Sequence, residues 1–152
     1  DTQTRWAVKD LSVDLTGIQD VEKTDVSAFQ AKGGEILMAH GMADALVSTR
    51  ATEQYYNRIR NTMGAAKVGL VMRYYEIPGY GHSTSSVFNA AWDSLTTLEN
   101  WVEKGVAPPS QVVADTAGVP NRTRPLCPYP QVARYKGSGS IDDAASFSCV
   151  TP

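Results

Sequence analysis

The apolar and polar positions near the start of the chain predict a short helix followed by a buried strand. Asp25 can cap the helix, and Gly33 can end it because glycine readily adopts the left-handed conformation found after a helix C-terminus. Residues 35–39 (EILMA) form a short, almost wholly apolar run, which is typical of a strand covered on both faces. Residues 1–24 are mixed and polar, so we expect an irregular approach segment there.

A helical period follows, and a second strand comes after it. The apolar side chains of the helix recur every four residues, at Ala51, Tyr55, Ile59 and Met63. Ser48 or Thr49 can cap this helix, and Gly64 can end it. Residues 68–77 (VGLVMRYYEI) predict a strand that stops at Pro78, because proline has no N–H to donate to a neighbouring strand.

A third helical pattern precedes a change in composition. Its apolar stripe consists of Val87, Phe88, Ala91, Trp92, Leu95, Leu98, Trp101 and Val102. Gly105 can end this helix, and the chain beyond it is rich in Pro, Gly, Ser and Thr, without a period. We therefore expect residues 1–105 to belong to an α/β domain, and residues 106–152 to form an irregular tail packed on the same domain.

The order helix, strand, helix, strand, helix predicts an α/β fold. Strands joined by a helical crossover are parallel neighbours, and helices cover both faces of such a sheet. Two parallel strands do not make a stable sheet by themselves. We expect the other strands to come either from residues beyond this sequence or from a partner chain.

Length, charge and hydropathy indicate about one domain, and they argue against nucleic acid or a membrane as a partner. The 152 residues correspond to about one domain. The net charge of −2 and the lack of a basic stripe give no electrostatic case for nucleic acid. The apolar runs are far shorter than the roughly 18 residues that span a bilayer, so a membrane is not an expected partner. The opening DTQTRWAVKD has neither an initiator methionine nor an apolar leader, and we expect a fragment or a processed chain.

Both cysteines, Cys127 and Cys149, lie in the tail, 22 residues apart. Neither has a second cysteine or a histidine at metal-ligand spacing, so a zinc site is not expected. An even number of cysteines in a loop-rich tail favours a disulfide that pins the C-terminus, which implies an oxidising compartment. The alternative is two free, buried thiols.

Two side chains suited to catalysis follow the predicted strands. Asp44 lies just beyond the first strand, and His82 lies just beyond the second. The carboxyl ends of parallel neighbours meet at one edge of a sheet, so we expect these side chains to lie close together. A carboxylate beside an imidazole fixes its tautomer and stabilises the imidazolium formed during proton transfer. Asp followed by His is also the order of the α/β-hydrolase triad after its serine.

Simpler roles are open for each of these residues. A single histidine on a loop is often only solvated, and an aspartate after a strand often caps the next helix. His40 is a competing histidine at the end of the first strand. We expect it to be a packed residue that shapes the loop carrying Asp44, rather than a catalytic group.

The sequence lacks a fitting nucleophile for such a triad. The elbow serine of an α/β-hydrolase has flanking glycines between a strand and a helix, and neither Ser12 nor Ser27, which precede Asp44, has them. The remaining candidates fit less well, being the GSGS run at 137–140 and the possible helix caps Ser83, Ser85 and Ser86. We expect the nucleophile to lie outside this chain, which alone would be inactive.

Several segments together carry a family resemblance. They are GGEILMAHGMAD (33–44), YYNRI (55–59), YEIPGYGH (75–82), FNAAWDSLTTLENWVEKGVAP (88–108), RTRPLCPYPQVARYKGSG (122–139) and IDDAASFSC (141–149). In this combination they resemble the C-terminal portion of the tannase and feruloyl esterase family of α/β-hydrolases.

The resemblance implies roles by position. Asp44 matches the family's triad acid and His82 its general base, while Cys127 and Cys149 match a tail disulfide. The N-terminal part of the same protein, as the expected partner, would supply the nucleophilic serine and a lid domain that often binds calcium. No cofactor or metal is expected in this chain. Members hydrolyse esters of aromatic acids, galloyl and feruloyl groups among them, and are usually secreted or periplasmic.

One position departs from the family pattern. Many members have a cysteine directly after the histidine, bridged to a cysteine just before the nucleophile, and this chain has Ser83 there. We expect that bridge to be absent, and the residue before the nucleophile not to be cysteine.

Two other interpretations of the function stay open. One is a non-catalytic fragment or subunit that completes the sheet of a partner chain. The other is a different α/β-hydrolase such as a peptidase, and the tail motif argues against it.

Overall fold

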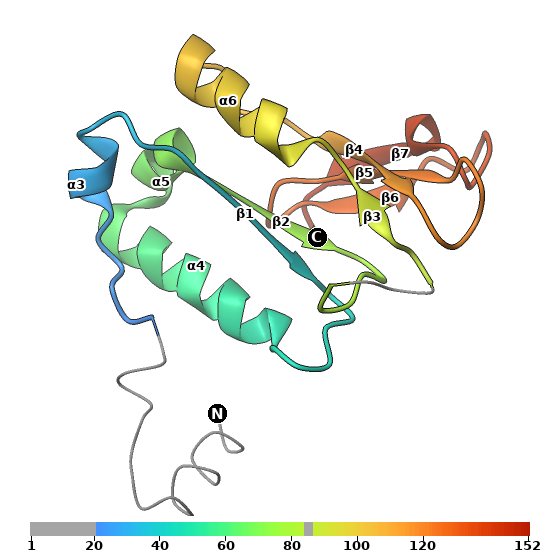
Figure 1. Ribbon diagram of the computed structural model, residues 1–152, viewed down its shortest axis with the longest axis horizontal. Coiled ribbons are helices and arrows are strands. Elements are labelled where there is room, and N and C mark those ends of the chain that lie inside the picture. The colour runs from blue at the N-terminus through green and yellow to red at the C-terminus, as the bar shows by residue number, and fades with distance from the viewer. Residues whose placement is uncertain (1–20, 84–86) are drawn as a thin grey trace, which may run out of the picture.

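Two parallel strands form the centre of the computed structural model, which describes residues 21–83 and 87–152. β1 (Ile36–Gly41) and β2 (Met72–Ile77) pair in parallel along their whole length (Figure 1). The predicted parallel pair is confirmed. In the part of the chain that the structure describes, β1 pairs with no other strand. The predicted irregular segment at residues 1–24 falls mostly outside that part.

Helices lead into β1 and connect it to β2. The first is α3 (Ser27–Gln30). The predicted cap at Asp25 is wrong by one residue, because the N-cap is Val26, although the Ser27 N–H donates to the Asp25 carboxylate at 2.9 Å. After β1 comes α4 (Thr49–Met63), which ends at Gly64. The φ of +86° at Gly64 is readily adopted only by glycine, and the chain resumes at once as α5 (Ala65–Val71).

The predicted strand over residues 68–77 is wrong in its first part, because residues up to Val71 belong to α5. An apolar run fits a buried helix as well as a strand. Val68 and Val71 are three residues apart, so they share one face of the helix, and both are fully buried. The strand itself begins only at Met72.

The third helix is shorter than its apolar stripe predicted. α6 (Ser94–Lys104) begins after Asp93, whose side chain accepts a hydrogen bond from the Thr96 N–H at 3.0 Å. The residues before it include the short strand β3 (Ala90–Ala91). Phe88 belongs to a hydrophobic cluster of the sheet rather than to the helix, although its spacing fits the stripe.

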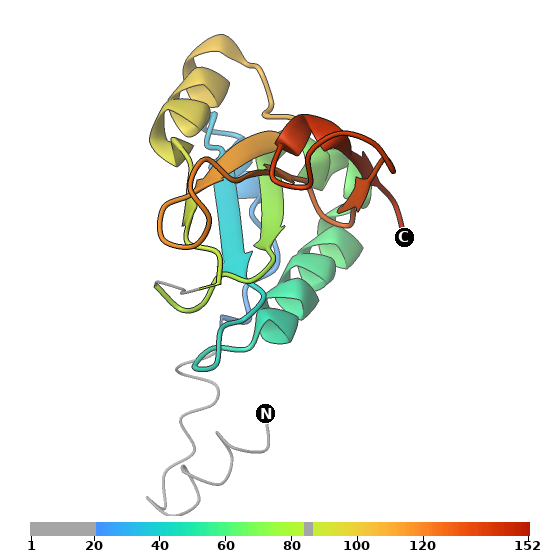
Figure 2. The same cartoon turned by 90° about the vertical axis from the view of Figure 1, so that its right-hand side faces the viewer.

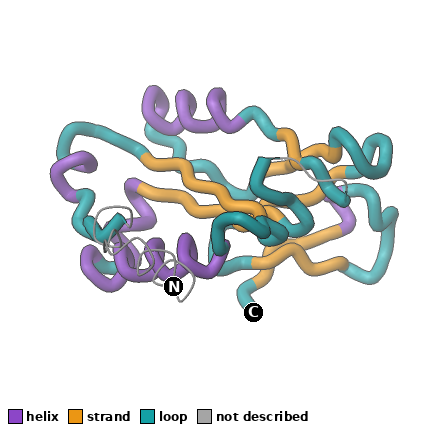
Figure 3. The backbone as a smooth tube through the Cα atoms, turned by 60° about the horizontal axis from the view of Figure 1, so that its bottom comes forward, coloured by secondary structure: helices purple, strands orange, loops and turns teal. Residues whose placement is uncertain are grey.

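The tail is more regular than the sequence predicted. Its elements are β4 (Gln111–Asp115), β5 (Thr123–Leu126), β6 (Val132–Tyr135), the 3-10 helix η1 (Ala144–Ser146) and β7 (Phe147–Val150). They form an antiparallel β3-β4-β5 sheet and an antiparallel β6-β7 pair, gathered toward one end of the molecule (Figure 3). Strands this short leave too few positions for an alternating pattern. The predicted disulfide between Cys127 and Cys149 is confirmed.

Alternate side chains of β2 face two hydrophobic clusters. Met72 and Tyr74 pack with residues of α4 and α5, whereas Tyr75 and Ile77 pack with Leu126 of the tail. Figure 2 shows α4 and α6 on opposite sides of the strand pair. Both faces of β2 are therefore covered, and this fixes the end of the strand from which the loop carrying His82 departs.

Candidate active site

The loops that follow β1 and β2 lie against each other at the carboxyl ends of the strands. A Cβ atom on Gly41 would lie 2.5 Å from the carbonyl oxygen of Gly81 and closer still to that of Tyr80, so no side chain fits between the loops. The N–H of Ala43 donates to the Tyr80 carbonyl at 2.9 Å. These contacts fix the position of one loop relative to the other.

A tight turn directs the second loop back toward the first. The turn is centred on Pro78 and Gly79, and the Tyr80 N–H closes it by donating to the Ile77 carbonyl at 3.3 Å. Gly79 has a φ of +74°, which residues with a Cβ atom adopt only with strain. The glycine-rich turn thus places His82 beside the loop that follows β1.

The structure brings Asp44 and His82 together. Nδ1 of His82 lies 3.0 Å from Oδ2 of Asp44. The other oxygen, Oδ1, accepts hydrogen bonds from the backbone N–H groups of Leu46 at 2.8 Å and Val47 at 2.9 Å. The side chain of Asp44 is 4% exposed and that of His82 is 52% exposed. An enclosed carboxylate therefore holds Nδ1 of a half-exposed imidazole, whose Nε2 has no partner among the described residues.

The environment of Asp44 favours its ionised form. The hydrogen bond from the Val47 N–H is the largest cause, and it lowers the pKa of the carboxyl. Burial acts in the opposite direction, but the Leu46 N–H and the His82 imidazole add to the lowering, so the pKa lies well below its ordinary value. An ionised carboxylate is the form that stabilises an imidazolium during proton transfer.

A second imidazole reaches the same carboxylate. Nε2 of His40 lies 3.2 Å from Oδ2 of Asp44 and 3.2 Å from the carbonyl oxygen of Val47, and its Nδ1 lies 2.7 Å from Oγ1 of Thr52. The His40 side chain is 12% exposed. The sequence led us to expect a packed histidine near the loop, but not its direct contact with Asp44. The four-residue spacing of His40 and Asp44 was the signal available.

A cavity of about 280 Å³ opens at this edge of the sheet. Asp44 and His82 line it together with apolar groups of Ala39, Val47 and Ile77. Electrostatic interactions are stronger beside apolar walls than in water, because the local dielectric is lower. The cavity therefore offers a reacting group access to the imidazole in partly apolar surroundings.

No serine in the part of the chain that the structure describes lines this cavity. Ser27 lies in α3, and the GSGS run at 137–140 lies in the loop between β6 and β7. The expected capping role of Ser83 is wrong, because the next helix begins only at Ser94 and is capped by Asp93. Ser12, Ser85 and Ser86 lie outside the described residues.

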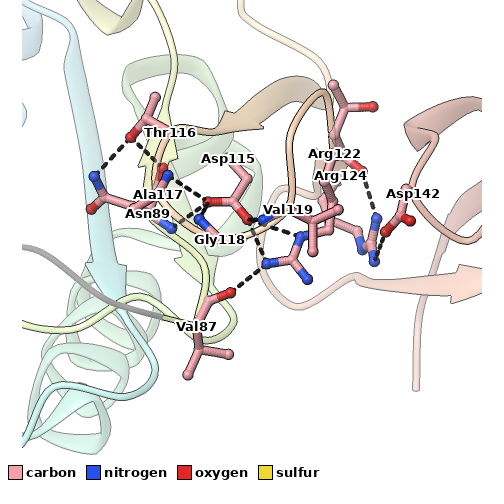
Figure 4. Close-up of polar contacts among 11 residues, drawn as sticks. Val87, Asn89, Asp115, Thr116, Ala117, Gly118, Val119, Arg122, Arg124 and Asp142 are labelled. Carbon is pink, nitrogen blue, oxygen red and sulfur yellow. Dashed lines mark hydrogen bonds and ion pairs between the residues drawn. The ribbon is translucent and has the colours of Figure 1, made fainter.

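A buried carboxylate, that of Asp115, gathers hydrogen bonds from the segment that begins at Val87 and from the β4–β5 turn (Figure 4). Asp115 accepts hydrogen bonds from the backbone N–H groups of Asn89, Ala117, Gly118 and Val119 and from the guanidinium of Arg122. Burial raises the pKa of Asp115, but the hydrogen bonds, led by that of the Gly118 N–H, outweigh this and hold the pKa far below its ordinary value. Arg122 also donates to the Val87 carbonyl, so the β4–β5 turn is tied to the segment after His82.

Residues 21–83 and 87–152 contain neither a cluster of metal ligands nor a membrane-spanning helix. No three His, Cys, Asp or Glu side chains in these ranges are grouped so that they could hold a metal ion. No helix in the same ranges has both the length and the apolar character required to cross a membrane.

Comparison with known proteins places the chain among esterases. A family model described as "Tannase and feruloyl esterase" matches residues 1–150. Mono(2-hydroxyethyl) terephthalate hydrolase of Piscinibacter sakaiensis is 44% identical over 136 residues, which cover 85% of this chain and 22% of that protein. A probable feruloyl esterase B-2 of Neosartorya fischeri is 32% identical over 171 residues, which cover 97% of this chain and 32% of that protein.

Solved structures share the fold. Feruloyl esterase B from Aspergillus oryzae superposes with a TM-score of 0.76 at 32% identity, over 84% of this chain and 29% of that one. Tannin acyl hydrolase from Aspergillus niger has a TM-score of 0.75 at 21% identity, over 97% of this chain and 28% of that one. The predicted α/β-hydrolase fold class is confirmed. The chain spans less than a third of the length of the relatives and structures described here.

Proposed function

Since the chain belongs to the tannase and feruloyl esterase family, we propose that it is the C-terminal portion of a serine carboxylic-ester hydrolase acting on aromatic esters of the galloyl or feruloyl type. The observation that carries the proposal is the 3.0 Å contact between Nδ1 of His82 and Oδ2 of Asp44. In this proposal Asp44 is the acid of the triad and His82 is its general base. No cofactor is assigned to this chain.

The reaction proceeds by acyl transfer. Nε2 of His82 takes the proton of the serine hydroxyl as the serine oxygen attacks the ester carbonyl, and the ionised Asp44 stabilises the imidazolium that forms. His82 then gives the proton to the leaving alcohol, which departs and leaves an acyl-serine. In the second half, His82 takes a proton from water as the water attacks the acyl group, and gives it to the serine oxygen as the free acid is released. The donors that stabilise the oxyanion belong to the other part of the protein.

The nucleophilic serine and the lid domain belong to the N-terminal part of the same protein, which is the partner of this chain in the proposal. Two observations support this. No described serine lines the cavity beside His82, and β1 has no strand on its other side among the described residues. A strand added there continues the sheet and brings its own carboxyl end to the same edge. By itself the chain is proposed to be inactive.

The proposed substrate class rests on the relatives. The names mono(2-hydroxyethyl) terephthalate hydrolase and feruloyl esterase both denote enzymes that act on an ester of an aromatic acid. The apolar part of the cavity, lined by Ala39, Val47 and Ile77, is compatible with a substrate of this kind. The alcohol half of the ester is left unspecified.

We further propose that the protein works in the periplasm or outside the cell. The support is the Cys127–Cys149 disulfide, because disulfides persist in oxidising compartments and are rare in the reducing cytosol. Fractionation of the native host, followed by detection of the protein in each fraction, tests this part of the proposal.

The test of the activity uses the full-length protein and its His82→Ala variant. Each is assayed with methyl esters of gallic and ferulic acid and with mono(2-hydroxyethyl) terephthalate, and methyl acetate serves as the non-aromatic control. We expect the wild type to hydrolyse at least one aromatic ester in preference to the control, and His82→Ala to lose at least about 100-fold in kcat. Activity of His82→Ala within a few-fold of wild type refutes the proposed role of His82.

A second candidate function is a non-catalytic fragment or subunit that completes the sheet of another chain. The unpaired side of β1 among the described residues favours this reading equally well. Intact mass and gel analysis of the purified native material discriminate between the two. A chain of this length that co-purifies with an inactive partner supports the structural role, whereas activity in the same polypeptide or complex supports the esterase.

A further inference from the structure

Two imidazoles share one oxygen of Asp44. Oδ2 lies 3.0 Å from Nδ1 of His82 and 3.2 Å from Nε2 of His40, while Oδ1 accepts the N–H groups of Leu46 and Val47. A carboxylate can rotate about its Cβ–Cγ bond, and that rotation decides whether an oxygen faces His82. Here both oxygens are held, and the only side chain besides His82 recorded in contact with Oδ2 among the described residues is His40.

The partners of His40 determine which of its nitrogens carries the proton. Nε2 lies 3.2 Å from both the Val47 carbonyl and the Asp44 carboxylate, and each of these can only accept, so Nε2 must be the protonated nitrogen. Nδ1 lies 2.7 Å from the hydroxyl of Thr52, which can donate to it. With the Thr52 hydroxyl donating to Nδ1, the proton of the ring lies on Nε2, the side that faces Asp44.

A second carboxylate, that of Glu76, also interacts electrostatically with His40. Glu76 lies opposite His40 in the register of β1 and β2, and its carboxylate accepts the Tyr74 hydroxyl at 3.2 Å. Thr52 comes from the second turn of α4, so the contact also joins the helix to the loop that carries Asp44.

We propose that His40 is a positioning residue of this site, which donates its Nε2 proton to Asp44 and holds Oδ2 in the orientation that His82 needs, while Thr52 fixes the tautomer of His40. This inference rests on the proposed esterase function. In this proposal His40, which also lines the cavity, acts through Asp44. Its loss therefore lowers the rate of the chemical step without weakening substrate binding.

The test compares His40→Gln with His40→Met in the full-length protein. The two replacements have similar length and volume, but only Gln carries a side-chain N–H that can donate to Asp44. We expect His40→Met to lower kcat about ten-fold or more with KM nearly unchanged, and His40→Gln to recover a large part of the loss. Equal kcat for the two variants, or a loss expressed in KM, overturns the proposal.

Thr52 provides an independent pair of variants. Thr52→Val removes the hydroxyl at nearly constant volume, and Thr52→Ser keeps it. We expect Thr52→Val to lower kcat several-fold and Thr52→Ser to stay near wild type. Thr62→Val is the control, because it makes the same change at the far end of α4, where the hydroxyl contacts only Thr24 among the described residues. An equal effect of Thr52→Val and Thr62→Val overturns the role of Thr52.

A spectroscopic readout requires neither activity nor a folded variant. In full-length protein labelled with ¹⁵N-histidine, the ring nitrogens of His40 at neutral pH should show a protonated Nε2 and an unprotonated Nδ1. The reverse tautomer overturns the proposal.

The kinetic outcomes also separate the role of His40 from the proposed esterase mechanism. An active wild type with an inactive His82→Ala and a fully active His40→Met refutes only the role of His40, whereas a fully active His82→Ala refutes the proposed esterase mechanism.

Discussion

Gly41 lies so close to the Tyr80 carbonyl that no methyl group can be placed between the loops that carry Asp44 and His82. We expect Gly41→Ala to push the loops apart and to lower kcat of the full-length protein by about 100-fold, the loss typical of a misplacement of about 1 Å. Esterase kinetics on the variant measure this effect.

The control for this prediction is Gly69→Ala on α5, where a new Cβ meets nothing within 4 Å. Alanine is the better helix former, so this variant should keep full activity and be slightly more stable. If Gly41→Ala and Gly69→Ala are equally active, the close approach of the loops is not needed to position the pair.

The Asp115 cluster should make the stability of the protein depend on pH in the acidic range. The pKa of Asp115 is lower in the folded protein than its ordinary value of about 3.9, so the unfolded chain binds the proton more tightly. The stabilisation from this group is present at neutral pH and is lost as the pH falls below about 4. Denaturant midpoints measured between pH 7 and pH 3 should fall accordingly.

Asp115→Asn isolates this contribution. The variant loses the charge that faces Arg122 and presents an amide donor to backbone N–H groups, so its denaturant midpoint at pH 7 should be clearly lower. Its midpoint should also depend less on pH than that of wild type. Asp142→Asn is the control, because its ion pair with Arg124 at 3.8 Å is partly exposed and should matter little. Parallel pH profiles for wild type and Asp115→Asn contradict this account.

The Cys127–Cys149 disulfide should stabilise the tail without taking part in catalysis. Its cysteines are 22 residues apart, and a closed loop of that length corresponds to roughly 3 kcal/mol of stabilisation. We expect the Cys127→Ser/Cys149→Ser variant to have a lower denaturant midpoint but nearly unchanged kcat at low temperature. A reductant should lower the midpoint of wild type and leave the variant unaffected. A large loss of kcat in the folded variant contradicts this separation of roles.

The parts of the fold that follow a strong period could be predicted from the sequence. The i, i+4 apolar spacing through Tyr55 and Ile59 identified α4, and glycine identified the ends of α4 and α6. The segment before Met72 was misassigned because an apolar run does not distinguish a buried helix from a strand. The tail strands were missed because pairing between distant short segments, such as β6 with β7, leaves little local signal.

In the candidate site, too, only the features that follow from local sequence patterns could be predicted. Asp44 and His82 could be proposed to lie together because each follows one of two strands joined by a helix. Such strands are parallel neighbours, and the order strand, helix, strand can be predicted from local sequence patterns. The contacts of His40 with Asp44 and Thr52 depend on the rotation of α4 against the loop, which no periodic pattern specifies. The Asp115 cluster was missed for a related reason, since its donors are backbone N–H groups, which every residue except proline possesses.

The central claim is that Asp44 and His82 activate a serine hydroxyl that lies outside these 152 residues. The most direct measurement is to treat the full-length protein with an organophosphonyl fluoride, which phosphonylates an activated serine with loss of fluoride, and to map the modified peptide. The account predicts one adduct, on a serine outside this chain, formed at least about 100-fold more slowly in Asp44→Asn and His82→Ala. An adduct on a serine within this chain, or labelling at the wild-type rate in His82→Ala, contradicts it.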